Sequence, residues 1–517
     1  MRNGFLISIV ASVLGAGVVH ADDALLNALK SGDDAAAVAA IDRGSDVNAR
    51  EPDGTSVLHW AVYDGDFDLV TRLIRAGADV KVSNDFGVTP LSQAAVTGDP
   101  RIIQALLKAG ADPESPNAEG QTALMVVART GNVESAKLLL RHGAKVNATE
   151  QWGGQTALMW AAAQSQPEMV KFLISKKANV NARAVVRDWQ RRVTAEGRPK
   201  DMNHGGFTPL LYAAREGCVE CAKNLIKGKA DINMTDPDRT TALVLAIMNF
   251  HFDLAAYLIS AGADVNKWDF FGQTPLYVAI DMNTLPRGGR PDIPSSDNTT
   301  ALQVAEMLLA AGANPNIQLK LRPPYRNAVF DRGGDPILDT GATPLLRAAA
   351  GADVPAINLL LKYKAMIDLP NATGVTPLMA AAGTGRSANP TRGRFKTDSD
   401  ALAAVRVLKE NGAQINMRDQ TGVTALHSAA QQGWDETVKV LVADGADLEA
   451  VDNKGLRPID FAVGRYERAF LAPEPKRQET TIKLLKEYIV AATGRQPLEF
   501  AGNLSTQQRG TGQSVDR

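Results

Sequence analysis

The sequence predicts an all-α repeat protein, a solenoid of about eleven helix pairs, and three observations support this fold class. A short motif of threonine, proline or alanine, and leucine recurs along the 517 residues, most often at intervals of 33. The chain is 45% hydrophobic but only 5% aromatic, so alanine and leucine, which favour helices, supply most of its apolar surface. Two cysteines cannot cross-link so long a chain, which packing must therefore hold together.

Residues 1–21 have the pattern of a cleavable secretory signal peptide. Arg2 supplies a positive charge, residues 5–19 are uncharged and apolar, and Val19 and Ala21 occupy the two positions that a signal peptidase reads. An uncleaved membrane anchor is the alternative, but this apolar core is shorter than the roughly 20 residues that span a bilayer. We therefore expect a periplasmic or secreted protein that begins at Asp22.

Each repeat predicts two helices in a fixed order. The first follows a serine or threonine whose hydroxyl can cap it, and a proline at its first position costs nothing because that N–H would have no partner. Small residues such as Ala94 and Ala95 allow close packing, a turn follows, and the second helix has apolar residues at helical spacing. A Gly-Ala-Asp-Val segment then ends it, with glycine suited to a left-handed conformation. The expected first helices follow Ser56, Thr89, Thr122, Thr156, Thr208, Thr241, Thr274, Thr343, Thr376, Thr424 and Arg457.

These motifs resemble the ankyrin repeat family, and the sequence is identified as an exported, bacterial member of it. The resemblance rests on the Thr-Pro-Leu-His helix start, the paired alanines and the Gly-Ala-Asp-Val-Asn ending. It implies an α-solenoid with projecting β-hairpin fingers and structural, hydrogen-bonding roles for His59 and His427. The sequence departs from the family at Lys177, Lys229 and Lys364, which stand where glycine ends the second helix. A left-handed conformation costs such a residue about 1–2 kcal/mol.

The repeats divide the expected mature chain into four regions. We expect a degenerate N-terminal half-cap at 22–50, the repeat array at 51–452, a C-terminal capping repeat at 453–496 and a disordered polar tail at 497–517. Lys483, Lys486 and Glu487 should lie on the last helix of the capping repeat.

Four insertions interrupt the array, at residues 184–203, 283–298, 320–338 and 385–399. Their net charges are +2, 0, +2 and +3, although the whole chain has a net charge of −1. Two interpretations stay open: the basic insertions fold back on an acidic solenoid, or they contact an anionic surface of a partner. The aromatic residues within them suit either interpretation; they are Trp189, Tyr325, Phe330 and Phe395.

Cys218 and Cys221 lie at the expected start of a second helix. Their i, i+3 spacing can meet disulfide geometry, and a local disulfide is plausible in an exported protein. The alternative is a loop cysteine beside a small buried cysteine.

Charge and motif content exclude several functions. The 56 basic and 57 acidic residues lack the positive excess of a dedicated nucleic-acid binder. The sequence contains no phosphate-binding loop, no Gly-x-Ser-x-Gly and no His-Glu-x-x-His, and its histidines lack metal-ligand spacing. We expect a monomer that is not an enzyme, with no catalytic residue, no metal site, no cofactor and no membrane span after signal cleavage.

What remains is a binding surface on the concave side of the solenoid. In the ankyrin family, partner contacts come from residues flanking the hairpin glycine and from those just after the paired alanines. Position by position, these are Tyr63, Asp64, Phe86, Glu119, Arg129, Trp152, Phe207, Arg215, Glu216, Phe270 and Phe271. Exposed aromatic residues commonly anchor interfaces. The alternative for Trp268, Phe270 and Phe271 is that they pack under the neighbouring insertions.

The function expected is therefore an exported, non-enzymatic protein–protein interaction scaffold or adaptor. It would hold a protein partner, whose surface the basic insertions suggest is anionic, in the concave face of the solenoid. An exported effector or envelope assembly factor, and an accessory subunit of an enzyme or a cryptic hydrolase, are the alternatives. The resemblance implies binding but names no partner.

Overall fold

The computed structural model describes residues 23–188, 192–193, 200–201, 204–284, 297–323, 337–385, 396–466 and 476–497. These residues form 24 α-helices and one two-stranded hairpin. The chain divides into two compact units, Met1–Ala182 (unit 1) and Arg183–Arg517 (unit 2), a division that the repeat pattern does not predict. The expected signal peptide, most of the four insertions with their aromatic residues, and residues 498–517 of the expected tail lie outside the described residues.

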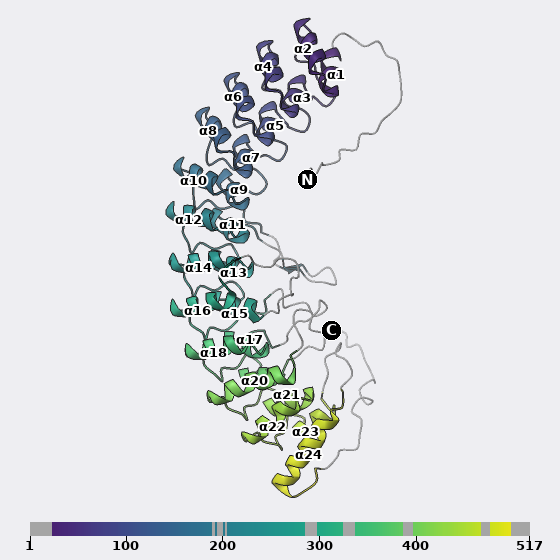
Figure 1. Cartoon of the computed structure of the whole chain (residues 1–517), viewed down its shortest axis with the longest axis vertical. Coiled ribbons are helices and arrows are strands. Elements are labelled where there is room, and N and C mark those ends of the chain that lie inside the picture. Colours follow the sequence, from purple (N-terminus) through teal and green to yellow (C-terminus); the bar gives the residue numbers. More distant parts are fainter. Residues whose placement is uncertain are drawn as a thin grey trace, which may run out of the picture. The chain divides into compact units, whose positions relative to one another are not determined.

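Unit 1 consists of helix pairs whose first helices pack on one another and whose second helices do the same, so that two rows form (purple to blue in Figure 1). The segment expected to be a half-cap contains a complete pair, α1 and α2. The helices are α1 (Asp23–Ser31), α2 (Asp34–Asp42), α3 (Val57–Asp64), α4 (Phe67–Arg75), α5 (Pro90–Thr97), α6 (Pro100–Lys108), α7 (Ala123–Thr130), α8 (Val133–Arg141), α9 (Ala157–Ala163) and α10 (Pro167–Ser175).

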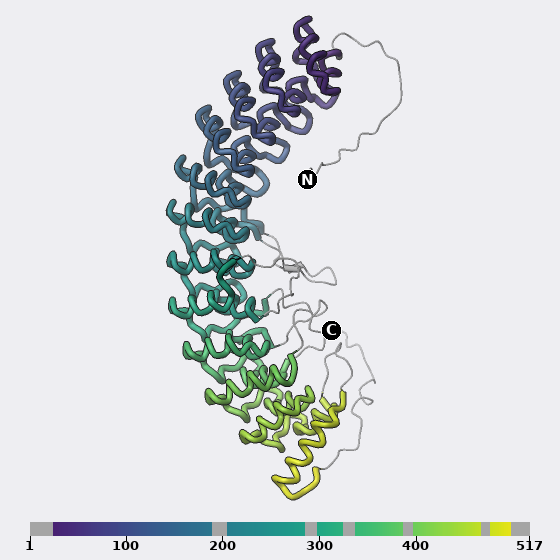
Figure 2. Tube along the Cα trace, viewed as in Figure 1, coloured from purple at the N-terminus to yellow at the C-terminus, as the bar shows by residue number. Residues whose placement is uncertain are grey.

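Unit 2 continues the same construction, as the tube in Figure 2 shows from teal to yellow. Its short strands β1 (Arg192–Val193) and β2 (Lys200–Asp201) pair antiparallel, with Arg192 opposite Asp201. The expected capping repeat holds the last two helices of the described residues. The helices are α11 (Pro209–Glu216), α12 (Val219–Lys227), α13 (Ala242–Met248), α14 (Phe252–Ser260), α15 (Pro275–Thr284), α16 (Ala301–Ala310), α17 (Pro344–Ala350), α18 (Val354–Lys362), α19 (Pro377–Ala381), α20 (Asp398–Glu410), α21 (Ala425–Gln432), α22 (Asp435–Ala443), α23 (Pro458–Ala462) and α24 (Glu479–Thr493).

The first helices begin at hydroxyl caps, as the motif predicts. At α5, Thr89 Oγ1 accepts the Ser92 N–H at 3.1 Å and Ser92 Oγ accepts the Thr89 N–H at 2.8 Å, which is a reciprocal capping box. Thr122 is an exception, because its buried hydroxyl makes no hydrogen bond at the start of α7. The paired alanines Ala94 and Ala95 are fully buried, which lets neighbouring first helices approach closely.

The three lysines that replace glycine adopt the predicted left-handed conformation. The φ angles are 68° at Lys177, 71° at Lys229 and 64° at Lys364. Gly77 holds the equivalent place after α4 with φ 95°. The backbone geometry of the repeat is therefore kept where the favourable residue is missing.

A polar side chain closes several of the hairpins between repeats. In the hairpin before α5, Asn84 Oδ1 accepts the backbone N–H groups of Phe86 at 3.1 Å and Val88 at 2.9 Å. In the hairpin before α15, an aspartate accepts the same pair of bonds: Asp269 Oδ1 accepts the N–H groups of Phe271 at 2.9 Å and Gln273 at 2.8 Å. These bonds present the residues at the hairpin tip to solvent.

Candidate protein-binding face

In unit 1, the aromatic residues predicted to contact a partner are strongly exposed. The exposed fractions are 62% for Tyr63, 62% for Phe86 and 75% for Trp152. Tyr63 lies on the last turn of α3, where its ring meets that of Trp60 edge to face at 6.0 Å. Trp60 Nε1 donates to Glu51 Oε2 at 3.0 Å, so the inner ring of the pair is fixed while Tyr63 is accessible.

The charged residues predicted for the same face in unit 1 are less uniform. Asp64 and Glu119 are exposed, whereas Arg129 is half-buried at the end of α7. Burial, followed by the nearby charges of Asp34 and Asp66, raises the pKa of Asp64 above its ordinary value. Negative charge is therefore crowded at this end of the face.

The sequence reasoning missed one exposed apolar residue of this face. Val96, on the last turn of α5, is 53% exposed. It stands 33 residues after Tyr63, and this repeat spacing is the signal that could have identified it.

In unit 2, the expectation that Phe207 is an exposed anchor is wrong. Phe207 is only 7% exposed, because its ring packs edge to face on Tyr212 at 5.4 Å, one turn into α11. The Arg215 guanidinium lies 5.9 Å from the Phe207 ring centre and 5.2 Å from that of Tyr212. Arg215 and Glu216 are exposed and pair with each other at 2.7 Å. Phe207 therefore packs on α11, and the side chains of Arg215 and Glu216 are the accessible ones at this position.

The aromatic residues of the next hairpin are in part held by the chain itself. Phe270 is 37% exposed and meets Phe271, which is half-buried, edge to face at 5.3 Å. The backbone N–H of Lys320 donates to the Phe271 carbonyl at 2.9 Å. Lys320 Nζ lies 3.1 Å from the Trp268 ring centre. These contacts favour packing against the start of insertion 320–338 for Trp268 and Phe271, and partner contact for Phe270 stays a prediction.

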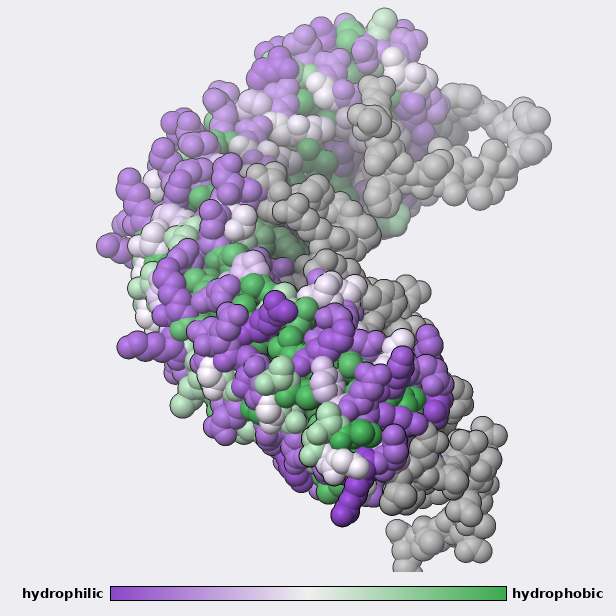
Figure 3. Space-filling model, turned by 60° about the horizontal axis from the view of Figure 1, so that its bottom comes forward, coloured by the Kyte–Doolittle hydropathy of each residue, from purple (hydrophilic) through white to green (hydrophobic). Residues whose placement is uncertain are grey.

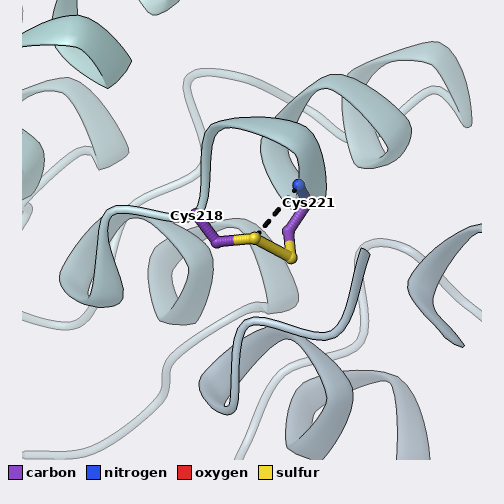
Figure 4. The surroundings of a disulfide bond; sticks show 2 residues. All are labelled: Cys218 and Cys221. Atoms are coloured by element: carbon purple, nitrogen blue, oxygen red, sulfur yellow. Dashed lines mark hydrogen bonds between the residues drawn. A yellow bond between two sulfur atoms is a disulfide. The ribbon is translucent and has the colours of Figure 1, made fainter. Parts of the chain in front are cut away.

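Cys218 and Cys221 form a disulfide at the start of α12, with Cα atoms 5.2 Å apart. Figure 4 shows the bridge inside the first turn, where Cys218 Sγ also accepts the Cys221 N–H at 3.2 Å. The sulfur therefore takes the place of a capping oxygen. In the chain-entropy account, closing so short a loop stabilises the folded state by only about 2 kcal/mol. The bridge therefore acts mainly on the first turn of α12.

Two buried hairpin carboxyls have strongly raised pKa values, and the sequence reasoning missed them. Burial raises the pKa of Asp236 to about 6 and that of Asp269 to about 7. Both are closing residues of adjacent hairpins, and the nearby charge of Asp236 adds to the rise in the pKa of Asp269. Equivalent positions hold asparagine at residues 84, 117 and 371, so a neutral side chain would serve the hairpin equally.

Asp281 of α15 and Arg347 of α17 form a buried ion pair between neighbouring first helices, and the sequence reasoning missed it too. Asp281 is fully buried and the Arg347 side chain is 7% exposed. Nearby, Asn283 Nδ2 and Thr284 Oγ1 both donate to Asp353 Oδ2, at 2.7 and 2.9 Å. This polar contact joins two repeats whose first helices are separated along the sequence by insertions 283–298 and 320–338, so only the folded chain brings these residues together.

The described residues do not arrange three or more histidine, cysteine or acidic side chains so that they could hold a metal ion. Among the same residues, the search found no helix with the length and apolar character needed to cross a membrane. In Figure 3, hydrophobic residues show among hydrophilic ones on the face turned forward.

Comparison with known proteins agrees with the repeat geometry. The family model for ankyrin repeats (3 copies) matches residues 25–117, 92–184, 210–319 and 397–471. The human transient receptor potential cation channel subfamily A member 1 is 30% identical over 248 residues, which are 46% of this chain and 21% of the channel. The Escherichia coli protein YahD, whose name describes an ankyrin repeat protein, is 27% identical over 237 residues, 46% of this chain and 95% of YahD.

The ankyrin repeat domain of Bcl-3 is 26% identical in sequence and covers 44% of this chain and 94% of its own, with a TM-score of 0.37. The chain spans only about a fifth of the length of the first curated relatives that it matches. The family model alone covers more than half of the chain, and ankyrin repeats are a protein–protein interaction scaffold. The chain belongs to the ankyrin repeat family.

Proposed function

We propose that this protein is an exported, non-enzymatic scaffold that binds a protein partner on the face formed by its first helices and hairpins. The observation that carries the proposal is the exposure of Tyr63, Phe86 and Trp152 on three repeats of unit 1. Large aromatic side chains are costly to leave in water and are typical anchors of interfaces. Their position at helix ends and hairpin tips leaves them free to enter a partner.

Two observations support export. Residues 1–21 have the charge, apolar core and small residues of a signal peptide. The Cys218–Cys221 disulfide suits an oxidising compartment, since such bonds rarely persist where thiols are kept reduced. N-terminal sequencing of the protein from the exported fraction should give Asp22 as its first residue, and a chain that keeps Met1 there would contradict cleavage.

The basic insertions suggest the character of a second contact, in unit 2. Their net positive charge would favour an anionic surface on the partner. These segments lie mostly outside the described residues, so this part of the proposal rests on sequence alone.

The experiment that tests the proposal is capture of partners by the tagged full chain from the native exported fraction, at low and high salt. A partner retained near stoichiometric amount is expected, and the variant Tyr63→Ala/Trp152→Ala should lose most of it. A control variant, Glu134→Gln/Glu168→Gln, changes exposed residues of the second helices and should retain it. Equal retention by both variants would contradict binding through the proposed face. If the retained protein is an enzyme or an envelope component, the chain is its accessory subunit or assembly factor.

A further inference from the structure

The hairpin tips of unit 1 carry acidic and aromatic side chains in alternation. The residues at these tips are Asp53, Phe86, Glu119 and Trp152, each 33 residues after the one before; the first three stand directly before a turn glycine, and Trp152 stands two residues before Gly154. We call these four residues the tip row. The glycines that follow adopt positive φ angles, from 62° at Gly154 to 81° at Gly54, which makes the turn and leaves the tip residue at its outer edge.

Neighbouring tips of the row touch one another. The Asp85 N–H donates to the Asp53 carbonyl at 2.8 Å, which joins the first two hairpins. A Cβ atom on Gly87 would lie 3.5 Å from Ala118 Cα, and one on Gly120 would lie 3.4 Å from Gln151 N. Successive hairpins therefore stack backbone against backbone, which keeps the four tip residues in an ordered series.

Three side chains of the tip row and two carboxylates beside it are available to a partner; the fourth tip residue, Asp53, is half-buried and its Oδ1 accepts the Thr55 N–H at 2.9 Å. Phe86 and Trp152 are 62% and 75% exposed. Glu119, Asp64 and Asp85 are exposed, and among the described residues none of their carboxylates has an ion pair or an accepted hydrogen bond. By contrast, two acidic residues of the second helices of this unit are paired: Asp42 bonds Arg72 at 2.7 Å, and Glu168 lies 4.0 Å from Lys171.

Charge in unit 1 is divided between its two faces. The segments with first helices and hairpins contain eight acidic and two basic residues; they are 49–66, 82–99, 115–132 and 148–165. The segments with second helices contain six acidic and eleven basic residues; they are 67–81, 100–114, 133–147 and 166–182. The large hydrophobic side chains that unit 1 exposes among the described residues all lie in the acidic set; they are Tyr63, Phe86, Val96 and Trp152. Exposed rings and unpaired negative charge thus share one face.

We propose that the tip row and the carboxylates beside it bind an extended segment of a protein partner that is rich in arginine or lysine. A carboxylate and an aromatic ring both attract a cation, through a charge-assisted hydrogen bond and through the ring quadrupole respectively. Neighbouring repeats lie about 8–10 Å apart and an extended chain advances about 3.3 Å per residue. In the polyproline II form of an extended segment, with three residues per turn and about 3.1 Å per residue, basic residues at every third position lie on one side and would meet successive tips.

This inference rests on the proposed function and adds the chemistry of the partner to it. The sign of charge is opposite to that suggested by the basic insertions of unit 2. The chain would therefore carry two contact surfaces with opposite preferences, one on each unit.

The test is fluorescence anisotropy of the full chain with a labelled peptide that has arginine at every third residue, against the same peptide with glutamate in those places. Only the arginine peptide should bind, and added salt should weaken it. Phe86→Ala/Trp152→Ala and Asp85→Asn/Glu119→Gln should each raise its Kd roughly tenfold. The control Glu134→Gln/Glu168→Gln removes two carboxylates from the other face of the same unit and should leave Kd unchanged.

Three results would overturn the inference: no binding of the arginine peptide, equal binding of the glutamate peptide, or an equal loss in the control variant. Circular dichroism of each variant establishes that it is folded. If the arginine peptide fails but a captured partner still depends on Tyr63 and Trp152, the cationic preference is wrong and the scaffold function survives. If capture fails as well, both are wrong.

Discussion

Nε2 of His59, in α3, lies 2.9 Å from the backbone carbonyl oxygen of Val88, which belongs to the next hairpin. Nδ1 of the same ring accepts the Ser56 N–H at 3.1 Å, so the proton is on Nε2 and is donated to Val88. One neutral imidazole thus caps its own helix and links it to the following repeat. His427 repeats the arrangement, with its Nε2 3.1 Å from the Leu456 carbonyl oxygen.

Replacing this imidazole should loosen the junction between two repeats. We expect His59→Ala and His427→Ala each to lower the free energy of unfolding by about 1–3 kcal/mol, because buried polar groups lose their partner. His142→Ala is the matched control, since His142 is exposed and bonds only within its own helix, to the Leu138 carbonyl. Urea unfolding followed by circular dichroism measures the difference. An equal effect in the control would contradict a role for the link.

The same two histidines should make the protein sensitive to mild acid. Burial, as the largest effect, holds the pKa of His59 and of His427 below its ordinary value of 6.5. The unfolded chain therefore binds more protons than the folded one as pH falls below about 6.5, and stability is lost in that direction. Urea midpoints of the parent and of His59→Asn/His427→Asn between pH 8 and pH 5 should converge as pH falls. A constant difference would show that these rings do not titrate with unfolding.

Asp269 should have the opposite pH dependence. Its folded pKa, raised to about 7 from 3.8, means that the folded state holds the extra proton, so stability is lost as pH rises from about 4 to 7. Asp269→Asn keeps the oxygen that accepts the Phe271 and Gln273 N–H groups. We expect it to stabilise the protein by about 1–3 kcal/mol at pH 8 and hardly at all at pH 4. Thermal melts at the two pH values measure this. Destabilisation at pH 8 would mean that the carboxylate has a role that the amide cannot fill.

Glycine should relieve the strained helix end at Lys364. Its φ of 64° disfavours a residue with a Cβ by about 1–2 kcal/mol, part of which glycine returns as chain entropy. We expect Lys364→Gly to stabilise the protein by about 0.5–1 kcal/mol. Lys176→Gly is the matched control. Lys176 directly precedes the left-handed residue Lys177 but itself has φ −96°, so glycine should destabilise the protein there. If both changes have the same sign, conformational strain is not the cause.

Removing one partner of the ion pair between Asp281 and Arg347 should destabilise the protein more than removing both charges. Arg347→Leu leaves the Asp281 carboxylate buried without its cation, and we expect a loss of about 3–5 kcal/mol. Arg347→Leu/Asp281→Asn removes the charge as well and should recover most of that loss. Unfolding of the parent, the single and the double variants forms the comparison. A double variant as unstable as the single one would show that packing, and not charge, dominates at this site.

The repeat itself could be predicted because each of its signals acts within a few residues. Hydroxyl caps such as Thr89 and left-handed ends such as Lys177 follow from local backbone chemistry, so a single sequence is enough to identify them. Phe207 was predicted as exposed because it flanks the hairpin glycine Gly206, where the family contacts its partners, but its burial depends on the neighbouring ring of Tyr212. The pairing of Asp281 with Arg347 depends on how two repeats with a long insertion between them align, which no local pattern encodes.

The candidate protein-binding face could likewise be predicted only in part from the sequence. The sequence located Tyr63, Phe86 and Trp152 by their place in the repeat, and the structure leaves their rings in solvent. Whether a carboxylate there is paired depends on side chains from other repeats, so the availability of Asp85 and Glu119 required coordinates.

The most direct test of the central idea is site-specific photo-crosslinking in the native exported fraction. A benzophenone side chain placed at Phe86 or Trp152, on the tip row, should attach the partner covalently. The same side chain at Glu134 or Glu168, on the second helices, should not. Attachment only from the second helices would contradict binding on the first-helix and hairpin face.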